Sequence, residues 1–176
     1  MDTNIITYSL NRSMPEHSRS RQFLEELTRR EDVALCEQVL IEVYLLTRNP
    51  TVFPHPYSAP EAAAVCERYR ASPTWRLIEC MPVMQEVWKQ AAQPTFARRR
   101  IIDVRLALTL RAGGVTEFAT RNTADFAGLG FQRVWDPLAE PAATARVPER
   151  PPRHHLRHQE RGSRAGDISA PFRRRA

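Results

Sequence analysis

The sequence predicts an α/β fold with a mostly parallel sheet, followed by a tail of different composition. Short apolar runs that suit buried strands alternate with longer segments of helical periodicity over residues 1–138. The hydrophobic fraction of 42% in a chain of 176 residues is sufficient for one core. We therefore expect one folded domain at residues 1–138 and a separate tail at residues 139–176.

Helices are expected where apolar residues recur every three or four positions. The expected helices cover residues 5–12, 16–30, 38–48, 61–70, 82–92 and 98–112. Pro50 ends the third of them, Pro60 occupies the first turn of the fourth, and Gly113 with Gly114 ends the last. Residues 49–60 contain four prolines and no periodicity, so we expect a loop there.

Strands are expected at residues 33–36, 75–80, 116–120 and 131–135. The first of these is apolar throughout and is bounded by charged residues, which is typical of a strand buried on both faces. Trp75, Trp88 and Trp135 fall on apolar patterns, and we expect all three in the core. Strands that alternate with helices in this way favour parallel pairing.

The tail differs from the rest of the chain in composition. Residues 139–176 contain five prolines and nine arginines against four acidic residues. They include few large apolar side chains to offset the entropy of ordering, so we expect disorder. The net charge of +6 and the isoelectric point of about 9.9 arise mostly from this tail and favour a polyanionic partner.

The cysteines and the N-terminus predict a cytoplasmic protein. Cys36, Cys66 and Cys80 are odd in number and lack the spacing of a metal site, as in reduced thiols. No apolar run approaches the length of a membrane span. Asp2 and Asn4 lie where a signal peptide would be basic. We therefore expect no membrane association.

Four acidic residues occur in positions that suggest a shared site: Asp2, Glu42, Asp103 and Asp125. Glu42 and Asp103 interrupt apolar helical segments, and Asp125 follows the third expected strand. Loops that follow parallel strands gather at one edge of the sheet, where ligands bind. Because buried carboxylates repel one another, a hard divalent cation would stabilise the group. The sequence thus predicts bound Mg²⁺ or Mn²⁺ that activates water for attack on a phosphodiester.

Two of these residues also have an ordinary interpretation, whereas Asp103 is flanked by apolar residues on both sides and is harder to explain in this way. Glu42 alone would lie at the rim of an apolar helix face with its carboxylate in water, and Asp125 alone would be a loop or cap residue.

Arg99 and Arg100 precede Asp103 by one turn, and Arg121 follows the third expected strand. These arginines are candidates for RNA phosphate contacts. The alternative is a solvated helix end, although basic charge there opposes the helix dipole.

Several stretches together resemble the PIN domain and, within it, the VapC-type ribonuclease toxins. They are Asp2-Thr3-Asn4 and the segments 39–44, 103–107 and 119–126, and residues 135–138 are similar to the family's closing strand. The resemblance implies a three-layer α/β/α sandwich with a mostly parallel central sheet, an acidic Mg²⁺ pocket and endoribonuclease activity on RNA. It also implies a cognate VapB-like antitoxin and frequent homodimerisation.

The resemblance also implies roles for particular residues. The acids carried over by position as catalytic groups and metal ligands are Asp2, Glu42, Asp103 and Asp125. Many relatives have an acid directly after Thr-Arg, where this chain has Asn122, so the fourth role is split between Asn122 and Asp125, and we favour Asp125. Asn4, Thr120 and Asn122 are expected to orient the ligands through hydrogen bonds.

Two departures from the family pattern leave alternative functions open. The Asp-Thr-Asn segment usually follows an apolar central strand, whereas only Met1 precedes it here. We therefore expect either a true start upstream or a sheet without part of its central strand. The tail is the second departure, because such toxins generally end near Leu138. The alternatives are a catalytically impaired PIN-like binding module and a nonspecific nucleic-acid binder that acts through its basic tail.

Overall fold

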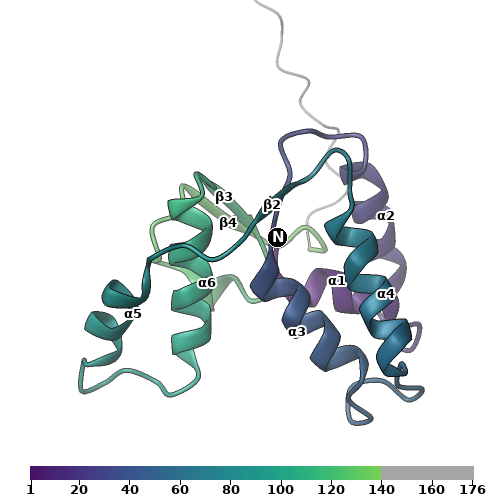
Figure 1. The fold of residues 1–176 in the computed structure, drawn as a ribbon, viewed down its shortest axis with the longest axis horizontal. Helices are drawn as coiled ribbons and strands as arrows, with labels where there is room; N and C mark the ends of the chain where they lie inside the picture. Colours follow the sequence, from purple (N-terminus) through teal and green to yellow (C-terminus); the bar gives the residue numbers. More distant parts are fainter. Residues whose placement is uncertain (140–176) are drawn as a thin grey trace, which may run out of the picture. The chain divides into compact units, whose positions relative to one another are not determined.

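The computed structural model describes residues 1–139, which form seven helices and four short strands (Figure 1). In chain order these are α1 (Thr3–Leu10), α2 (His17–Leu27), β1 (Ala34–Cys36), α3 (Glu37–Thr47), α4 (Ala59–Arg70), β2 (Arg76–Ile78), α5 (Met84–Ala91), α6 (Arg100–Ala112), β3 (Glu117–Ala119), α7 (Thr123–Phe126) and β4 (Arg133–Trp135). Every predicted helix and strand is present with shifted ends, whereas the short helix α7 was not predicted. The α/β class is confirmed.

The strands pair in parallel, as predicted, but they form two separate ladders. β1 pairs with β2, and β3 pairs with β4. The N-terminal residues hydrogen-bond to one strand of each pair. The Met1 amino group donates to the carbonyl oxygen of Ala34 at 3.3 Å, and the Asp2 N–H donates to that of Ala119 at 2.9 Å. A three-layer sandwich around one central sheet therefore stays a prediction.

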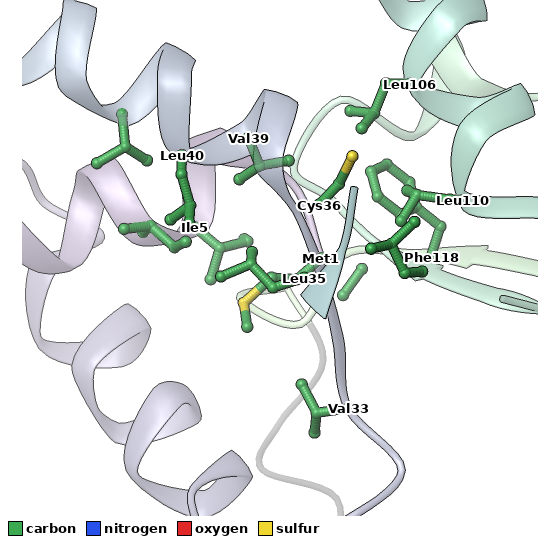
Figure 2. Close-up of a cluster of buried hydrophobic side chains, with 14 of the residues drawn as sticks. Met1, Ile5, Val33, Leu35, Cys36, Val39, Leu40, Leu106, Leu110 and Phe118 are labelled. Carbon is green, nitrogen blue, oxygen red and sulfur yellow. The ribbon is translucent and has the colours of Figure 1, made fainter. Parts of the chain in front are cut away.

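The core of the described residues joins helices α1, α3 and α6 to strands β1 and β3 (Figure 2). Figure 2 shows Met1 beside Leu35 of β1, and Leu110 of α6 near Phe118 of β3. The fully buried apolar side chains include Ile5, Ile6, Leu35, Val39, Val43, Leu106, Leu110 and Phe118. Each such side chain stabilises the fold by roughly 1.5–3 kcal/mol, so this core fixes the helices that carry the predicted acids.

Helix ends follow the signals in the sequence. Ser58 caps α4, and its backbone N–H donates to the Glu61 carboxylate at 2.8 Å, with Pro60 in the first turn as predicted. Gly113 ends α6, and Gly114 has a φ of +82°, a left-handed conformation that favours glycine. The first of these signals sets where the loop after α3 ends, and the second sets where the loop before β3 begins.

The prediction that Trp88 lies in the core is wrong. Its side chain is 59% exposed, whereas its neighbour Val87 is fully buried. Successive residues of a helix point about 100° apart, so a narrow buried face on α5 accommodates only one of the two. Trp75 and Trp135 are partly buried and pack against the core.

The predicted tail at residues 139–176 lies outside the described residues except for Ala139. Its disorder and the domain boundary at residue 138 therefore stay predictions. Within residues 1–139, no helix has the length and apolar character needed to cross a membrane.

Candidate active site

Asp2 is a buried carboxylate held by three hydrogen-bond donors. It caps the N-terminus of α1, and its Oδ1 accepts from the Thr3 N–H at 2.7 Å. Its Oδ2 accepts from Asn4 Nδ2 at 2.8 Å and from the Thr120 hydroxyl at 2.6 Å. Burial raises the pKa of Asp2, and the charge of Glu42 adds to this, although the Thr120 and Thr3 hydrogen bonds oppose the shift. The side chain is thus fixed in orientation but poorly solvated.

The residues predicted to orient this carboxylate lie around it. Asn4 Nδ2 also approaches the Thr120 hydroxyl at 3.2 Å, and the Asn4 side-chain oxygen accepts from the Arg121 N–H at 3.3 Å. The Asn122 N–H donates to the Thr120 hydroxyl at 2.9 Å. Asn122 therefore contributes its backbone N–H to this network. These bonds connect the segment after β3 to the start of α1.

Glu42 of α3 is also held at both carboxylate oxygens. The Thr3 hydroxyl donates to Oε2 at 2.8 Å, and Gln38 Nε2 donates to Oε1 at 3.2 Å. Thr3 and Gln38 were not among the predicted site residues. The spacing of Gln38 and Glu42, four positions apart on one helix, is the signal that could have identified Gln38. Thr3 connects Glu42 to the segment that carries Asp2.

Asp103 lies in the first turn of α6, where the negative charges of the other three acids act on it. Its side chain is half-buried, and its pKa is raised to about 6. Burial is the largest cause, followed by the negative charges of Asp125, Asp2 and Glu42, while Arg100 opposes the shift. Chain segments that are far apart in the sequence therefore bring four carboxylates into one electrostatic neighbourhood.

Asp125 is an exposed residue on helix α7. The buried residue of this helix, Phe126, packs against Phe118 of β3 with ring centroids 4.5 Å apart. The Arg100 guanidinium donates to the backbone carbonyl of Asp125 at 3.4 Å. Among the neighbouring carboxylates, Asp125 has the largest effect on the pKa of Asp103. The choice of Asp125 over Asn122 for the fourth acidic position stays a prediction.

The predicted RNA-binding arginines differ in their surroundings. Arg99 is exposed just before α6, and Arg100 is the first residue of that helix. Arg121 forms ion pairs with Glu16 at 3.7 Å and with Asp136 at 2.5 Å. The charge of Arg121 is therefore compensated by two carboxylates.

The acids fit a hard divalent cation in their chemistry. Carboxylate oxygens are the ligands that Mg²⁺ and Mn²⁺ prefer, and a cation would relieve the repulsion that raises the pKa of Asp103. Across residues 1–139, however, no three His, Cys, Asp or Glu side chains converge closely enough to bind a metal as they stand. The carboxylates would have to draw together around an ion.

Comparisons with known proteins identify the family. No protein-family model matches the chain. It is 56% identical over 138 residues to Ribonuclease VapC24 of Mycobacterium tuberculosis strain CDC 1551 / Oshkosh and to the protein of the same name in strain ATCC 25618 / H37Rv. Each alignment covers 78% of this chain and 95% of the relative. With this identity over nearly the whole of the relatives, the chain belongs to the VapC-type toxins of the PIN domain family.

Proposed function

We propose that this chain is an endoribonuclease toxin that hydrolyses RNA phosphodiester bonds with Mg²⁺ or Mn²⁺ at the acidic cluster. The family relationship supports RNA as the substrate. The observation that carries the proposal is geometric: Asn4 and Thr120 hold the Asp2 carboxylate, Thr3 links that segment to the Glu42 carboxylate, and Gln38 links Glu42 to the helix that carries Asp103. Burial and the neighbouring acids raise the pKa of Asp103, in agreement with this arrangement. The negative charges of these acids repel one another and lower the stability of the folded protein. A bound cation would remove this repulsion, which is why such a cluster favours a binding site.

The residues of the cluster have distinct parts in the proposed reaction. Asp2, Glu42 and Asp103 would hold the cation, with Asp125 as the fourth acid. The chemistry that a bound divalent cation supplies is activation of the attacking water and stabilisation of the leaving oxygen. Thr120 and the other donors keep the Asp2 carboxylate from rotating away.

The substrate would be positioned by exposed and partly exposed basic residues. Arg99 and Arg100 lie at the start of the helix that carries Asp103, and we propose that they contact RNA phosphates beside the cluster. Arg121 is proposed as a weaker contact, because Glu16 and Asp136 compensate its charge.

An RNA cleavage assay with and without Mg²⁺ or Mn²⁺ tests the proposal. Asp2→Asn and Asp103→Asn should each reduce metal-dependent cleavage by about 100-fold or more, which is roughly 3 kcal/mol. Asp32→Asn is the matched control, because Asp32 is exposed and pairs with Arg30. Undiminished cleavage by both cluster variants would refute the proposal.

The second candidate is a catalytically impaired PIN-like binding module. It is favoured by the fact that no three potential ligands among residues 1–139 already converge. Calorimetry with Mn²⁺ separates the two candidates, since an impaired module should bind no Mn²⁺. The nonspecific binder is tested by deleting residues 139–176, which should abolish RNA binding only if the tail is responsible.

We propose that a groove on the N-terminal helices binds a VapB-like antitoxin. The groove has a volume of about 620 Å³ and is lined by side chains of α1, α2 and α4 together with Trp75. Its lining is mixed: several apolar and aromatic side chains, such as Leu24, Tyr69 and Trp75, lie among polar ones, which suits an amphipathic partner segment. Arg12, Arg21 and Arg68 lie along it against the single carboxylate of Glu25, which favours acidic residues on the partner.

We also propose a homodimer through helix α3. Ile41 and Leu45 are 59% and 61% exposed and lie four residues apart on one face of this helix. Ile41, together with Leu40 and Tyr44, lines a groove of about 410 Å³ between α3 and α4. A second copy of the chain would cover these side chains.

We also propose a cytoplasmic location, which the free cysteines of residues 1–139 support.

A further inference from the structure

The side chain of Gln38 connects the two helices that carry Glu42 and Asp103. Gln38 lies in the first turn of α3 and is only 9% exposed. Its Nε2 donates to Glu42 Oε1 at 3.2 Å and to the carbonyl oxygen of Ile102 at 3.1 Å. Ile102 belongs to α6 and directly precedes Asp103. One amide group therefore contacts both helices at the acidic cluster.

The chemistry of its neighbours fixes which end of the Gln38 amide faces them. The Glu42 carboxylate and the Ile102 carbonyl only accept hydrogen bonds, so the NH₂ group must point toward both. Gln38 Oε1 is then buried without a donor among the described residues. A buried acceptor without a partner destabilises the folded state, and an apolar side chain of the same length would avoid this cost.

The contact with α6 is not required to satisfy its backbone. In a regular α-helix, the carbonyl oxygen of Ile102 accepts from the N–H four residues later. The bond from Gln38 is an additional one, and its position ties α3 to the start of α6. The clearest effect of Gln38 is thus on the relative placement of Glu42 and Asp103.

The Glu42 carboxylate is held from two sides. The Thr3 hydroxyl donates to Oε2 at 2.8 Å, and Gln38 donates to Oε1. Each oxygen uses one lone pair for these bonds and keeps another for a ligand. Donors arranged in this way orient a carboxylate without preventing it from binding a cation.

We propose that Gln38 is a positioning residue of the acidic cluster: it orients the Glu42 carboxylate and couples α3 to α6, so that Glu42 and Asp103 present oxygens to the same divalent cation. This inference rests on the proposed function, because it requires a cation at the cluster. It accounts for the buried amide whose oxygen has no partner, since only a donor at this position can contact both acceptors.

The test is the Mn²⁺ affinity of Gln38→Met, measured by calorimetry on the full chain, together with the melting temperature of the metal-free protein. Methionine keeps the length of the side chain but removes both hydrogen bonds. We expect the affinity to fall by about 10- to 100-fold. The melting temperature should stay the same or rise, because the unpaired acceptor is removed.

Gln22→Met is the matched control. Gln22 lies on α2 and donates to Glu26 Oε1 at 3.2 Å, the same distance and the same four-residue spacing, but both residues are exposed. This variant should leave Mn²⁺ affinity unchanged. If Gln38→Met binds Mn²⁺ as tightly as Gln22→Met does, the inference is overturned, whatever happens to the melting temperature.

A double-mutant cycle covers the case in which Gln38→Met also lowers stability. If Gln38 acts through Glu42, the substitution should change Mn²⁺ affinity by less than about 2-fold in a Glu42→Gln background. An equal loss in both backgrounds would assign Gln38 a structural role only. Absence of Mn²⁺ binding and RNA cleavage in the wild-type protein would overturn the proposed function as well, whereas normal binding by Gln38→Met overturns this inference alone.

Discussion

The Thr120 hydroxyl donates to the Asp2 carboxylate at 2.6 Å, although 118 positions separate the two residues. Both groups are buried, so water does not compete for this bond. Thr120 follows β3 and Asp2 precedes α1, so the bond joins the end of a strand to the start of a helix.

Thr120→Val should weaken Mn²⁺ binding and RNA cleavage by about 10- to 100-fold, because it frees the buried Asp2 carboxylate to reorient. Thr120→Ser, which retains the hydroxyl, should restore most of the loss. Thr51→Val is the control, since the Thr51 hydroxyl donates to Asn49 in an exposed loop. Calorimetry and a cleavage assay measure the effect. Equal values for Thr120→Val and Thr51→Val would contradict the prediction.

In the absence of metal, Asp103→Asn should raise the melting temperature at neutral pH. The pKa of Asp103 is about 6 in the folded protein, above its ordinary value of 3.8, so the folded state binds more protons between these values. Wild-type stability therefore falls as pH rises from about 4 to about 6.

Because the Asp103 carboxylate is half-exposed, solvent screening limits the change in the free energy of unfolding to about 1 kcal/mol. This corresponds to a shift in melting temperature of roughly 2–4 °C. The difference between Asp103→Asn and wild type should vanish near pH 4. Thermal unfolding with a chelator present, from pH 4 to pH 7.5, measures it. Asp32→Asn should show no such gain, because Arg30 lowers the pKa of Asp32. A gain that is equal at all pH values would refute this explanation.

Mn²⁺ should stabilise the wild-type protein and a chelator should reverse the effect. At a Mn²⁺ concentration 100 times the dissociation constant, the free energy of unfolding should rise by about 2.7 kcal/mol. The melting temperature should then rise by roughly 5–10 °C. Asp2→Asn should lose most of this gain, whereas Glu117→Gln, an exposed change on β3, should keep it. Differential scanning calorimetry measures the shift. The absence of any shift in wild type would favour the impaired binding module.

Ile41→Lys with Leu45→Lys should convert a dimer to a monomer, because the new charges would be buried against the second copy. Ala112→Lys is the control, since Ala112 is exposed at the end of α6. Analytical ultracentrifugation determines the mass. If wild type is monomeric at all concentrations, or if the double variant stays dimeric, α3 is not the dimer contact.

Arg21→Glu with Arg68→Glu should weaken binding of an acidic, apolar antitoxin segment by about 10-fold or more, with a smaller loss at high salt. Arg29→Glu changes the same charge at an exposed position just after α2 and should have little effect. RNA cleavage by the free protein should be unchanged in both variants. Fluorescence anisotropy with a labelled peptide gives the affinities. Unchanged binding by the groove variant would place the antitoxin elsewhere.

Periodicity in the sequence was sufficient to predict most helices and strands, because burial of apolar side chains determines both. It was not sufficient for α7, since a helix of four residues is shorter than any periodic signal. It also placed Trp88 in the core, because an apolar pattern does not reveal how narrow a buried face is. Pairing of the strands into two ladders depends on contacts between distant segments.

The acids of the candidate site were proposed from their settings in the sequence together with the family resemblance, and their role stays a prediction; most of their hydrogen-bond partners could not be predicted. Gln38 and Thr3 are ordinary polar residues in the sequence, and their importance appears only when α1, α3 and α6 are placed together. Asn4 and Thr120 were predicted through the family resemblance. Contacts across more than 100 positions, such as that of Thr120 with Asp2, leave no local pattern.

The fourth acid of the cluster, Asp125, lies on the short helix α7. Three donors hold the Asp2 carboxylate and two hold that of Glu42. The segment of Asp125 is held by the Phe126 ring beside Phe118 and by the Arg100 guanidinium, which donates to the Asp125 carbonyl oxygen. A single helical turn held in this way reorganises at low cost. If the proposed cation binds at this cluster, adjustment of this one turn would let the fourth carboxylate approach ions of different radius while Asp2 and Glu42 stay held, and the size of residue 126 would then influence which metal the protein prefers.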